Sequence, residues 1–196
     1  MKKIVIPDSI KGLIFDCDGT LVDSMPMHMK AWEYALSHFG APWNYDFIFD
    51  QKGKSSTDIV EMYNREYKIS LDVVRVSDLK QEYFHRNYLD TKPIQQVVDV
   101  VLHYKNVLPM AVASGGSRKN VHLQLEVIGI KDFFPIILTA DDDIQTKPAP
   151  DIFLEAARLM NVTPNLCLVF EDGDLGLEAA KKAGMQSIDV REYVLT

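Results

Sequence analysis

The chain has 196 residues, which suits one domain of ordinary size or one domain that carries a sizeable insertion. Hydrophobic residues make up 47% of it, enough to bury a proper core, yet no apolar run approaches the length that crosses a bilayer. The net charge is −7 and the sequence holds no cluster of lysine and arginine, so neither nucleic acid nor a membrane is an expected partner.

The N-terminal segment indicates a cytoplasmic protein. Its apolar run, Ile4-Val5-Ile6, is interrupted by Pro7 and is too short for the core of a secretion signal. The two cysteines, Cys17 and Cys167, both fall within predicted buried strands, where a thiol acts as a small hydrophobic group. We therefore expect no disulfide framework and no nucleophilic cysteine, and we expect the chain to be a monomer.

The first predicted strand is followed by two carboxylates. The apolar run at residues 12–15 is typical of a buried parallel strand, and Asp16 and Asp18 follow it before Gly19 turns the chain. Burying a charge is costly unless it is paired or binds a metal, and open α/β sheets bind ligands beyond the carboxyl ends of their strands. The pattern therefore indicates an acidic site. Taken alone, the same residues also fit an ordinary Asp-Gly turn with one capping aspartate.

Residues 24–90 show helical spacing of apolar residues and no convincing strand. The predicted pieces are a helix that ends at Gly40, an irregular aromatic-rich segment at 44–52, a helix through Ile59 and a helix at 72–88. This part of the chain is therefore predicted to be an all-helical insertion.

From Pro93 onward, predicted helices and strands alternate. The strands are expected at residues 109–114, 135–139, 166–170 and 187–190, with helices at 94–102, 117–128, 151–160 and 175–183. Such alternation is typical of a parallel, doubly wound sheet. We predict an α/β fold in which residues 1–23 and 91–196 form a Rossmann-like parallel-sheet core and residues 24–90 form an inserted helical cap.

Polar side chains are expected together at the carboxyl edge of this sheet, because parallel strands end on one edge. They are Asp16 and Asp18 after the first strand, Ser114 after the second, Lys147 beyond the third, and Glu171 with Asp172 after the fourth. Carboxylates about 4 Å apart repel by roughly 4 kcal/mol at an effective dielectric near 20, so their convergence calls for a cation. Oxygen ligands without histidine or thiolate favour Mg²⁺ over zinc. With a lysine and a hydroxyl suited to phosphate oxygens, the set outlines a phosphoryl-transfer site.

These residues resemble the four motifs of the haloacid dehalogenase superfamily. The matching stretches are Asp16-Cys17-Asp18-Gly19-Thr20, Ser114, Lys147-Pro148 and Glu171-Asp172. The resemblance covers essentially the whole chain, including the position of the helical insertion between the first and second motifs. Within the superfamily, residues 147–153 and 170–176 are similar to the β-phosphoglucomutase-like branch.

The resemblance implies a role for each matching residue. Asp16 would attack phosphorus and form an aspartyl-phosphate, while Asp18 would act first as general acid and then as general base. The implied Mg²⁺ ligands are the Asp16 carboxylate, the Asp18 backbone carbonyl and the Asp172 carboxylate, with Glu171 in or near the metal's shell. The implied holders of the phosphoryl oxygens are Ser114, Lys147 and the amide of Gly115.

The cap is expected to select the substrate. His28 matches a histidine that meets the substrate in mutase relatives, although packing on the stripe of Trp32 is an equal alternative. Mutases also hold a second phosphate with an arginine after a loop glycine. Here the loop is Gly53-Lys54-Ser55-Ser56, with Ser56 in the arginine's place, and serine cannot replace a bidentate cation. Gly53 and Lys54 stay candidate substrate-binding residues beside His28 and Gly115.

The missing arginine favours a hydrolase of small sugar phosphates over a mutase. The run of motifs also resembles bacterial fructose-1-phosphatases of this branch, so fructose 1-phosphate is the leading substrate. Three alternatives stay open: a β-phosphoglucomutase-type isomerase, a receiver-like phosphoacceptor signalling domain and a non-catalytic sugar-phosphate binder. Asp18 and the helical insertion argue against the receiver, which needs a long-lived phospho-aspartate with no acid/base beside it.

Overall fold

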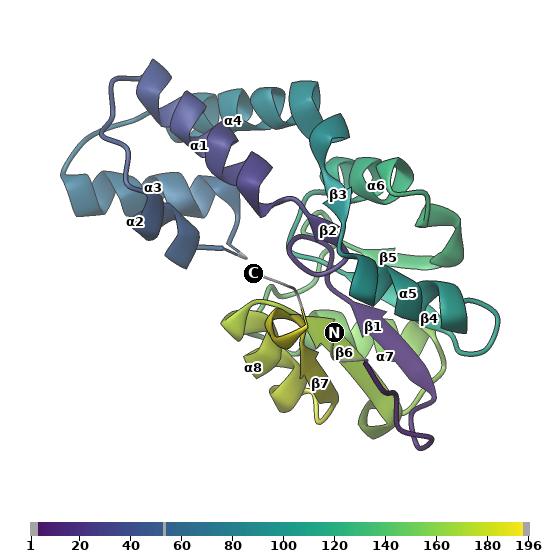
Figure 1. Cartoon of the computed structure of the whole chain (residues 1–196). Coiled ribbons are helices and arrows are strands. Elements are labelled where there is room, and N and C mark those ends of the chain that lie inside the picture. Colours follow the sequence, from purple (N-terminus) through teal and green to yellow (C-terminus); the bar gives the residue numbers. More distant parts are fainter. Residues whose placement is uncertain (1–3, 53, 194–196) are drawn as a thin grey trace. The chain divides into compact units, whose positions relative to one another are not determined.

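The structure is a computed structural model and describes residues 4–52 and 54–193 (Figure 1). The chain divides into two compact units. One joins the segment up to Asp23 with the segment from Lys92 onward, and the other runs from Ser24 to Thr91. We call the first the core unit and the second the helical unit. None of the helices in the described residues has both the length and the apolar composition needed to cross a membrane.

The core unit contains one parallel sheet of five strands in the order β5-β4-β1-β6-β7. The strands are β1 (Gly12–Phe15), β4 (Met110–Ala113), β5 (Ile136–Leu138), β6 (Cys167–Glu171) and β7 (Gln186–Asp189). The first strand is central, and Phe15 lies opposite both Val112 of β4 and Phe170 of β6. The predicted α/β fold with a doubly wound parallel sheet is therefore confirmed.

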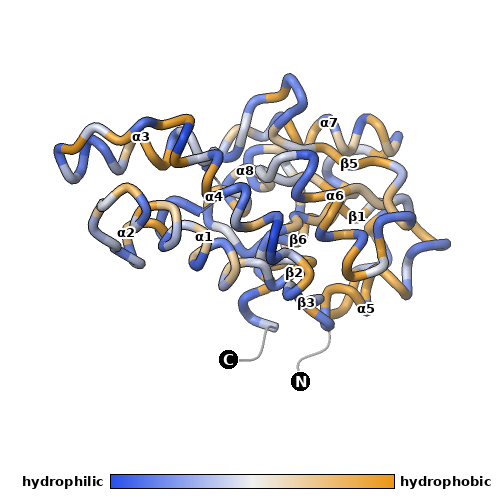
Figure 2. Tube along the Cα trace, turned by 90° about the horizontal axis from the view of Figure 1, so that it is seen from above, coloured by the Kyte–Doolittle hydropathy of each residue, from blue (hydrophilic) through white to orange (hydrophobic). Residues whose placement is uncertain are grey.

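Helices cover both faces of the sheet because side chains alternate along each buried strand. They are α5 (Gln95–Tyr104), α6 (Arg118–Val127), α7 (Asp151–Leu159) and α8 (Asp174–Lys182). Leu13 and Phe15 of β1 belong to the apolar cluster that contains α5 and α6, whereas Ile14 belongs to the cluster that contains α7 and α8. Figure 2 shows the apolar β1, β5 and α5 in orange.

The helical unit contains no strand among residues 24–52 and 54–91. Its elements are α1 (Met25–His38), α2 (Tyr45–Asp50), α3 (Ser56–Tyr67), α4 (Val73–Asn87) and the short 3₁₀ turn Tyr88–Asp90. The prediction of an irregular segment at residues 44–52 is wrong, because α2 lies there. Its start is fixed by Asn44, whose side-chain oxygen accepts from the backbone N–H of Phe47 at 3.0 Å, and Ile48 anchors it in the unit's apolar core.

The chain leaves and re-enters the core unit at one place. The short strands β2 (Val22–Asp23) and β3 (Lys92–Pro93) pair antiparallel, with Val22 opposite Pro93. The backbone N–H of Ile94 also donates to the carbonyl of Leu21 at 2.9 Å. These bonds tie both connecting segments to the end of the loop that follows β1.

Candidate active site

The predicted site residues of the core unit meet at the carboxyl edge of the sheet. Asp16 continues β1, and its backbone N–H donates to the carbonyl of Phe170 in β6 at 3.0 Å. Ser114 follows β4, and its backbone N–H donates to the carbonyl of Leu138 in β5 at 3.0 Å. Because β6 ends at Glu171, the acidic pair Glu171-Asp172 emerges beside Asp16.

Lys147 reaches this edge from the loop between β5 and α7. Its ammonium donates to Asp16 Oδ1 at 2.7 Å and to Glu171 Oε1 at 2.5 Å. The lysine side chain is 6% exposed, and the ammonium also lies 5.0 Å from the ring centroid of Phe153. Loop residues carry no strand or helix pattern, so the sequence alone did not show that this lysine folds back onto Asp16.

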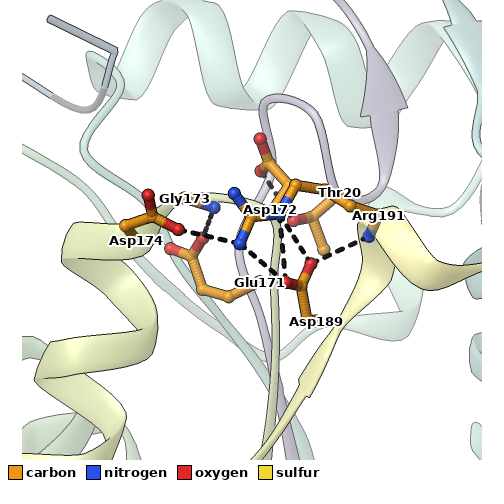
Figure 3. A network of polar contacts seen from close by, with 7 residues as sticks. All are labelled: Thr20, Glu171, Asp172, Gly173, Asp174, Asp189 and Arg191. Carbon is orange, nitrogen blue, oxygen red and sulfur yellow. Dashed lines mark hydrogen bonds and ion pairs between the residues drawn. The ribbon is translucent and has the colours of Figure 1, made fainter. Parts of the chain in front are cut away.

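Three carboxylates converge around that lysine. Asp16, Glu171 and Asp172 each offer one oxygen, these oxygens lie within 4.8 Å of one another, and all three residues are buried. Glu171 Oε2 accepts from the backbone N–H of Gly173 at 2.7 Å, and Thr20 donates its hydroxyl to Asp172 Oδ1 at 3.1 Å (Figure 3). An all-oxygen, anionic donor set fits Mg²⁺ or Ca²⁺ better than zinc.

The electrostatics of the site reflect this crowding. Burial, reinforced by Glu171 and Asp172 and opposed by Lys147, raises the pKa of Asp16 well above its usual value. Burial alone would lower the pKa of Lys147, but the carboxylates of Asp16 and Glu171 outweigh it and raise that pKa, so the lysine stays charged. One buried lysine therefore faces three carboxylates, and a cation among them would relieve the remaining repulsion.

Two glycines leave room for the acids. Gly19 has a φ of +80°, and a methyl group built on it would lie 2.6 Å from Asp172 Oδ2. A methyl group on Gly176, in the first turn of α8, would overlap the carboxyl group of Glu171. Gly19 and Gly176 are thus packing requirements of Asp172 and Glu171, respectively.

Asp18 and Ser114 flank a glycine turn. Ser114 Oγ accepts from the backbone N–H of Gly116 at 3.1 Å, and Gly115 lies between them in the same turn. A methyl group on Gly116 would come 3.1 Å from Asp18 Oδ2, so the Asp18 carboxylate lies against this turn. Asp18 is half-buried, unlike Asp16.

Neither cysteine has the environment of a nucleophile. Burial, with the negative charges of Asp18 and Asp16, raises the pKa of Cys17 well above its usual value, and burial raises the pKa of Cys167 to about 11. Both thiols lie in the apolar clusters of the core unit. A thiol held protonated and packed among apolar side chains is inert.

The predicted cap residues lie in the helical unit. His28 on α1 stacks on Phe84 with ring centroids 4.3 Å apart, and its Nδ1 lies 3.0 Å from the ammonium of Lys80. Ser56 accepts a hydrogen bond from Gln81 at 3.3 Å, and Lys54 donates to Gln51 at 2.9 Å. Gly53 lies outside the described residues.

Sequence reasoning missed Lys80 and Thr20. Lys80 is 5% exposed, and it falls in an apolar row with Val76 and Phe84 at four-residue spacing on α4. A lysine that interrupts an apolar stripe of a helix is the sequence feature from which Lys80 could have been predicted. Thr20 lies inside the acidic motif, but only the fold reveals its bond to Asp172.

Comparison with known proteins gives the family. A model of the haloacid dehalogenase-like hydrolases matches residues 13–190. The chain is 36% identical over 180 residues to the fructose-1-phosphate phosphatase of Escherichia coli (strain K12), covering 92% of this chain and 96% of that protein. Among solved structures, a hydrolase from Pseudomonas syringae matches with a TM-score of 0.80 and 26% identity, over 90% of this chain and 83% of that one. A β-phosphoglucomutase from Clostridium difficile matches with a TM-score of 0.77 and 29% identity, over 91% and 83%.

The fold, the buried acidic site and these relatives define a hydrolase of phosphoric monoesters. The match of the family model and the 36% identical relative show that the chain belongs to the haloacid dehalogenase-like hydrolase family. The resemblance drawn from the four motifs is therefore confirmed, and membership of this family argues against the alternative of a receiver-like signalling domain.

Proposed function

We propose that this chain is a Mg²⁺-dependent phosphatase of small sugar phosphates, with fructose 1-phosphate as its leading substrate. The observation that carries the proposal is the buried contact of Asp16 with Lys147 at the end of β1, beside Glu171 and Asp172. A carboxylate nucleophile needs a nearby cation to stabilise the negative charge of the phosphoryl group that it attacks. Asp16 supplies the carboxylate and Lys147 the cation. A monomeric, cytoplasmic enzyme with residues 24–90 as its cap stays our expectation.

Asp16 and Asp18 divide the reaction between them. A carboxylate oxygen of Asp16 attacks phosphorus, the bond from phosphorus to the sugar oxygen breaks, and Asp18 gives that oxygen its proton. Asp18 then takes a proton from a water molecule that attacks the aspartyl-phosphate, which releases inorganic phosphate and restores Asp16. A positioned acid/base contributes roughly a hundred- to ten-thousand-fold. The half-buried Asp18 suits this exchange better than a fully enclosed carboxyl.

Lys147, Ser114 and the amide of Gly115 would hold the phosphoryl oxygens. The Lys147 ammonium has a third donor beyond its bonds to Asp16 and Glu171. The Ser114 hydroxyl accepts from Gly116 and so keeps its own proton for a ligand oxygen. These donors face the same edge of the sheet as Asp16.

The residues present fit Mg²⁺. The proposed ligands are the carboxylates of Asp16 and Asp172 and the backbone carbonyl of Asp18, with Glu171 in or near the shell. When bound, the ion would supply positive charge for the oxygens of the transferring group. Thr20 and Gly173 orient two of the acids through the bonds described above.

The choice of substrate rests on two supports. The E. coli relative at 36% identity is a fructose-1-phosphate phosphatase. In the helical unit, Ser56 stands where a mutase would place an arginine, and it bonds to the neutral amide of Gln81. A neutral pair suits sugar hydroxyls, whereas a second phosphate calls for a bidentate cation. The alternative is a β-phosphoglucomutase-type isomerase, which the match to the C. difficile enzyme supports.

A substrate panel tests the proposed function. We expect phosphate release from fructose 1-phosphate, and we expect no glucose 6-phosphate from β-glucose 1-phosphate supplied with β-glucose 1,6-bisphosphate. Released phosphate and glucose 6-phosphate are measured separately in the same reactions. Conversion to glucose 6-phosphate without phosphate release would show that the chain is a mutase.

Metal removal is expected to abolish the activity. Three carboxylates around one lysine leave an excess of negative charge that repels a phosphate ester. We expect chelation with EDTA to lower turnover by at least about a hundred-fold, because the metal supplies several kcal/mol of charge stabilisation. Excess MgCl₂ should restore turnover, while protein dialysed without chelator serves as control. Unchanged turnover in EDTA would contradict the metal requirement.

A further inference from the structure

We propose that Arg191 is a positioning residue for the metal site, because it clamps the end of β7 to the start of α8 on either side of Glu171 and Asp172. Arg191 lies in the 3₁₀ turn Val190–Glu192, directly after β7. No motif pointed to it. Its role is visible only from the contacts that its guanidinium makes.

The guanidinium forms a fork between two carboxylates. Nε donates to both oxygens of Asp189, at 2.8 and 3.0 Å, and Nη2 donates to Asp189 Oδ2 at 2.6 Å. The same Nη2 donates to Asp174 Oδ1 at 2.8 Å. Figure 3 shows Arg191 between these two acids, with Glu171 and Asp172 beside them. The bonds to Asp189 and Asp174 raise the pKa of Arg191, so its charge is permanent.

Both carboxylates are rigidly connected to the proposed metal ligands. Asp189 lies opposite Glu171 in the register of β6 and β7. Asp174 begins α8, two residues after Asp172, and Gly173 between them donates its N–H to Glu171. The turn that carries the arginine is itself anchored, because Val190 is fully buried in the core. A shift of α8 away from β7 would therefore displace Asp172 and the backbone N–H of Gly173 that holds the Glu171 carboxylate.

Charge and geometry predict opposite effects at this position. Arg191 neutralises acids near the site, so its loss would leave more negative charge there and tighten binding of a cation by charge alone. If the arginine instead fixes the direction of Asp172 and Glu171, its loss weakens the binding. The proposal rests on the proposed function, because it takes these two acids as metal ligands.

The test is calorimetric titration of Mg²⁺ into the metal-free full chain. We expect Arg191→Lys to raise the Mg²⁺ dissociation constant about ten-fold. This is the smaller of the losses in metal affinity that follow when a residue orienting a metal ligand is replaced. Lysine keeps the charge but cannot reproduce the two-pronged fork. Arg191→Gln should raise the dissociation constant as well. The metal-free Tm should change little, because the arginine is 44% exposed and exposed ion pairs contribute little to stability.

A matched control is available on α7. Arg158, in the last turn of α7, makes a two-pronged contact with the single carboxylate of Glu155, with Nε and Nη2 each 2.7 Å from a carboxylate oxygen, and its side chain is exposed. Arg158→Lys should leave the dissociation constant unchanged. A wild-type constant in Arg191→Lys, or tighter binding in Arg191→Gln, would overturn the positioning role. If the wild-type chain takes up no Mg²⁺, the metal requirement of the proposed function fails and this proposal falls with it.

Discussion

Asp16→Asn is expected to lower turnover on fructose 1-phosphate by on the order of ten-thousand-fold or more, while the protein stays folded. Asparagine keeps an oxygen that can accept from Lys147, but it has no anionic oxygen to attack phosphorus. The neighbouring carboxylates of Glu171 and Asp172 come from the end of β6 rather than β1, and Asp18 serves as the acid/base, so none of them takes the place of Asp16. Near-normal turnover in Asp16→Asn would remove Asp16 as the nucleophile.

The stability of this variant gives a second, independent readout. In the metal-free protein the pKa of Asp16 is raised above the ordinary 3.8, first by burial and then by its acidic neighbours. When folding raises the pKa of a carboxyl group, the protein's free energy of unfolding falls as the pH rises through the pKa of the folded state. The neutral amide introduced by Asp16→Asn would avoid that loss, so the metal-free variant should melt no lower than the wild type at neutral pH. The difference should vanish as the pH falls toward 3.8.

The control for this substitution is Asp99→Asn on α5. Asp99 is exposed and accepts from Gln95 at 2.7 Å on the same helix. Its charge is lost as in Asp16→Asn, but it has no part in the site. Full turnover is expected, and a matching loss in both variants would point to a general effect of charge.

The acidic edge could be predicted from sequence because parallel topology alone brings strand ends together. Asp16, Ser114 and Glu171 follow recognisable apolar runs, so an α/β fold places them side by side whatever the details of packing. Lys147 could be named from its motif, but its 2.7 Å approach to Asp16 depends on the path of a loop. Periodicity says nothing about such a path.

The features that escaped prediction depend on side-chain contacts between distant segments. Arg191 reaches Asp174 across 17 positions of the sequence, and Thr20 reaches Asp172 across 152. The helix α2 escaped for a local reason, because six residues are too few to show helical spacing and the capping bond of Asn44 decided the outcome. Short helices and polar contacts between distant segments are therefore features of this fold that the three-dimensional structure reveals and the sequence pattern does not.

Lys147→Met is expected to damage both catalysis and stability. Turnover should fall by about a hundred- to a thousand-fold, because a preorganised positive charge on the phosphoryl oxygens is lost. The metal-free protein should lose about 3 kcal/mol of its free energy of unfolding, since removing one partner of a buried ion pair leaves the others uncompensated. Chemical denaturation in EDTA measures this loss. Retention of full stability would show that the buried carboxylates of Asp16 and Glu171 do not need the lysine.

The matched control separates burial from the ion pair itself. Lys131 lies 2.5 Å from Glu126, the same separation as Lys147 from Glu171, but its side chain is 32% exposed rather than 6%. Lys131→Met should therefore cost less than about 1 kcal/mol and leave turnover intact. Because Mg²⁺ replaces part of the lost positive charge, it should raise the Tm of Lys147→Met more than that of the wild type. An equal rise in both would mean that the ion and the lysine do not share the same carboxylates.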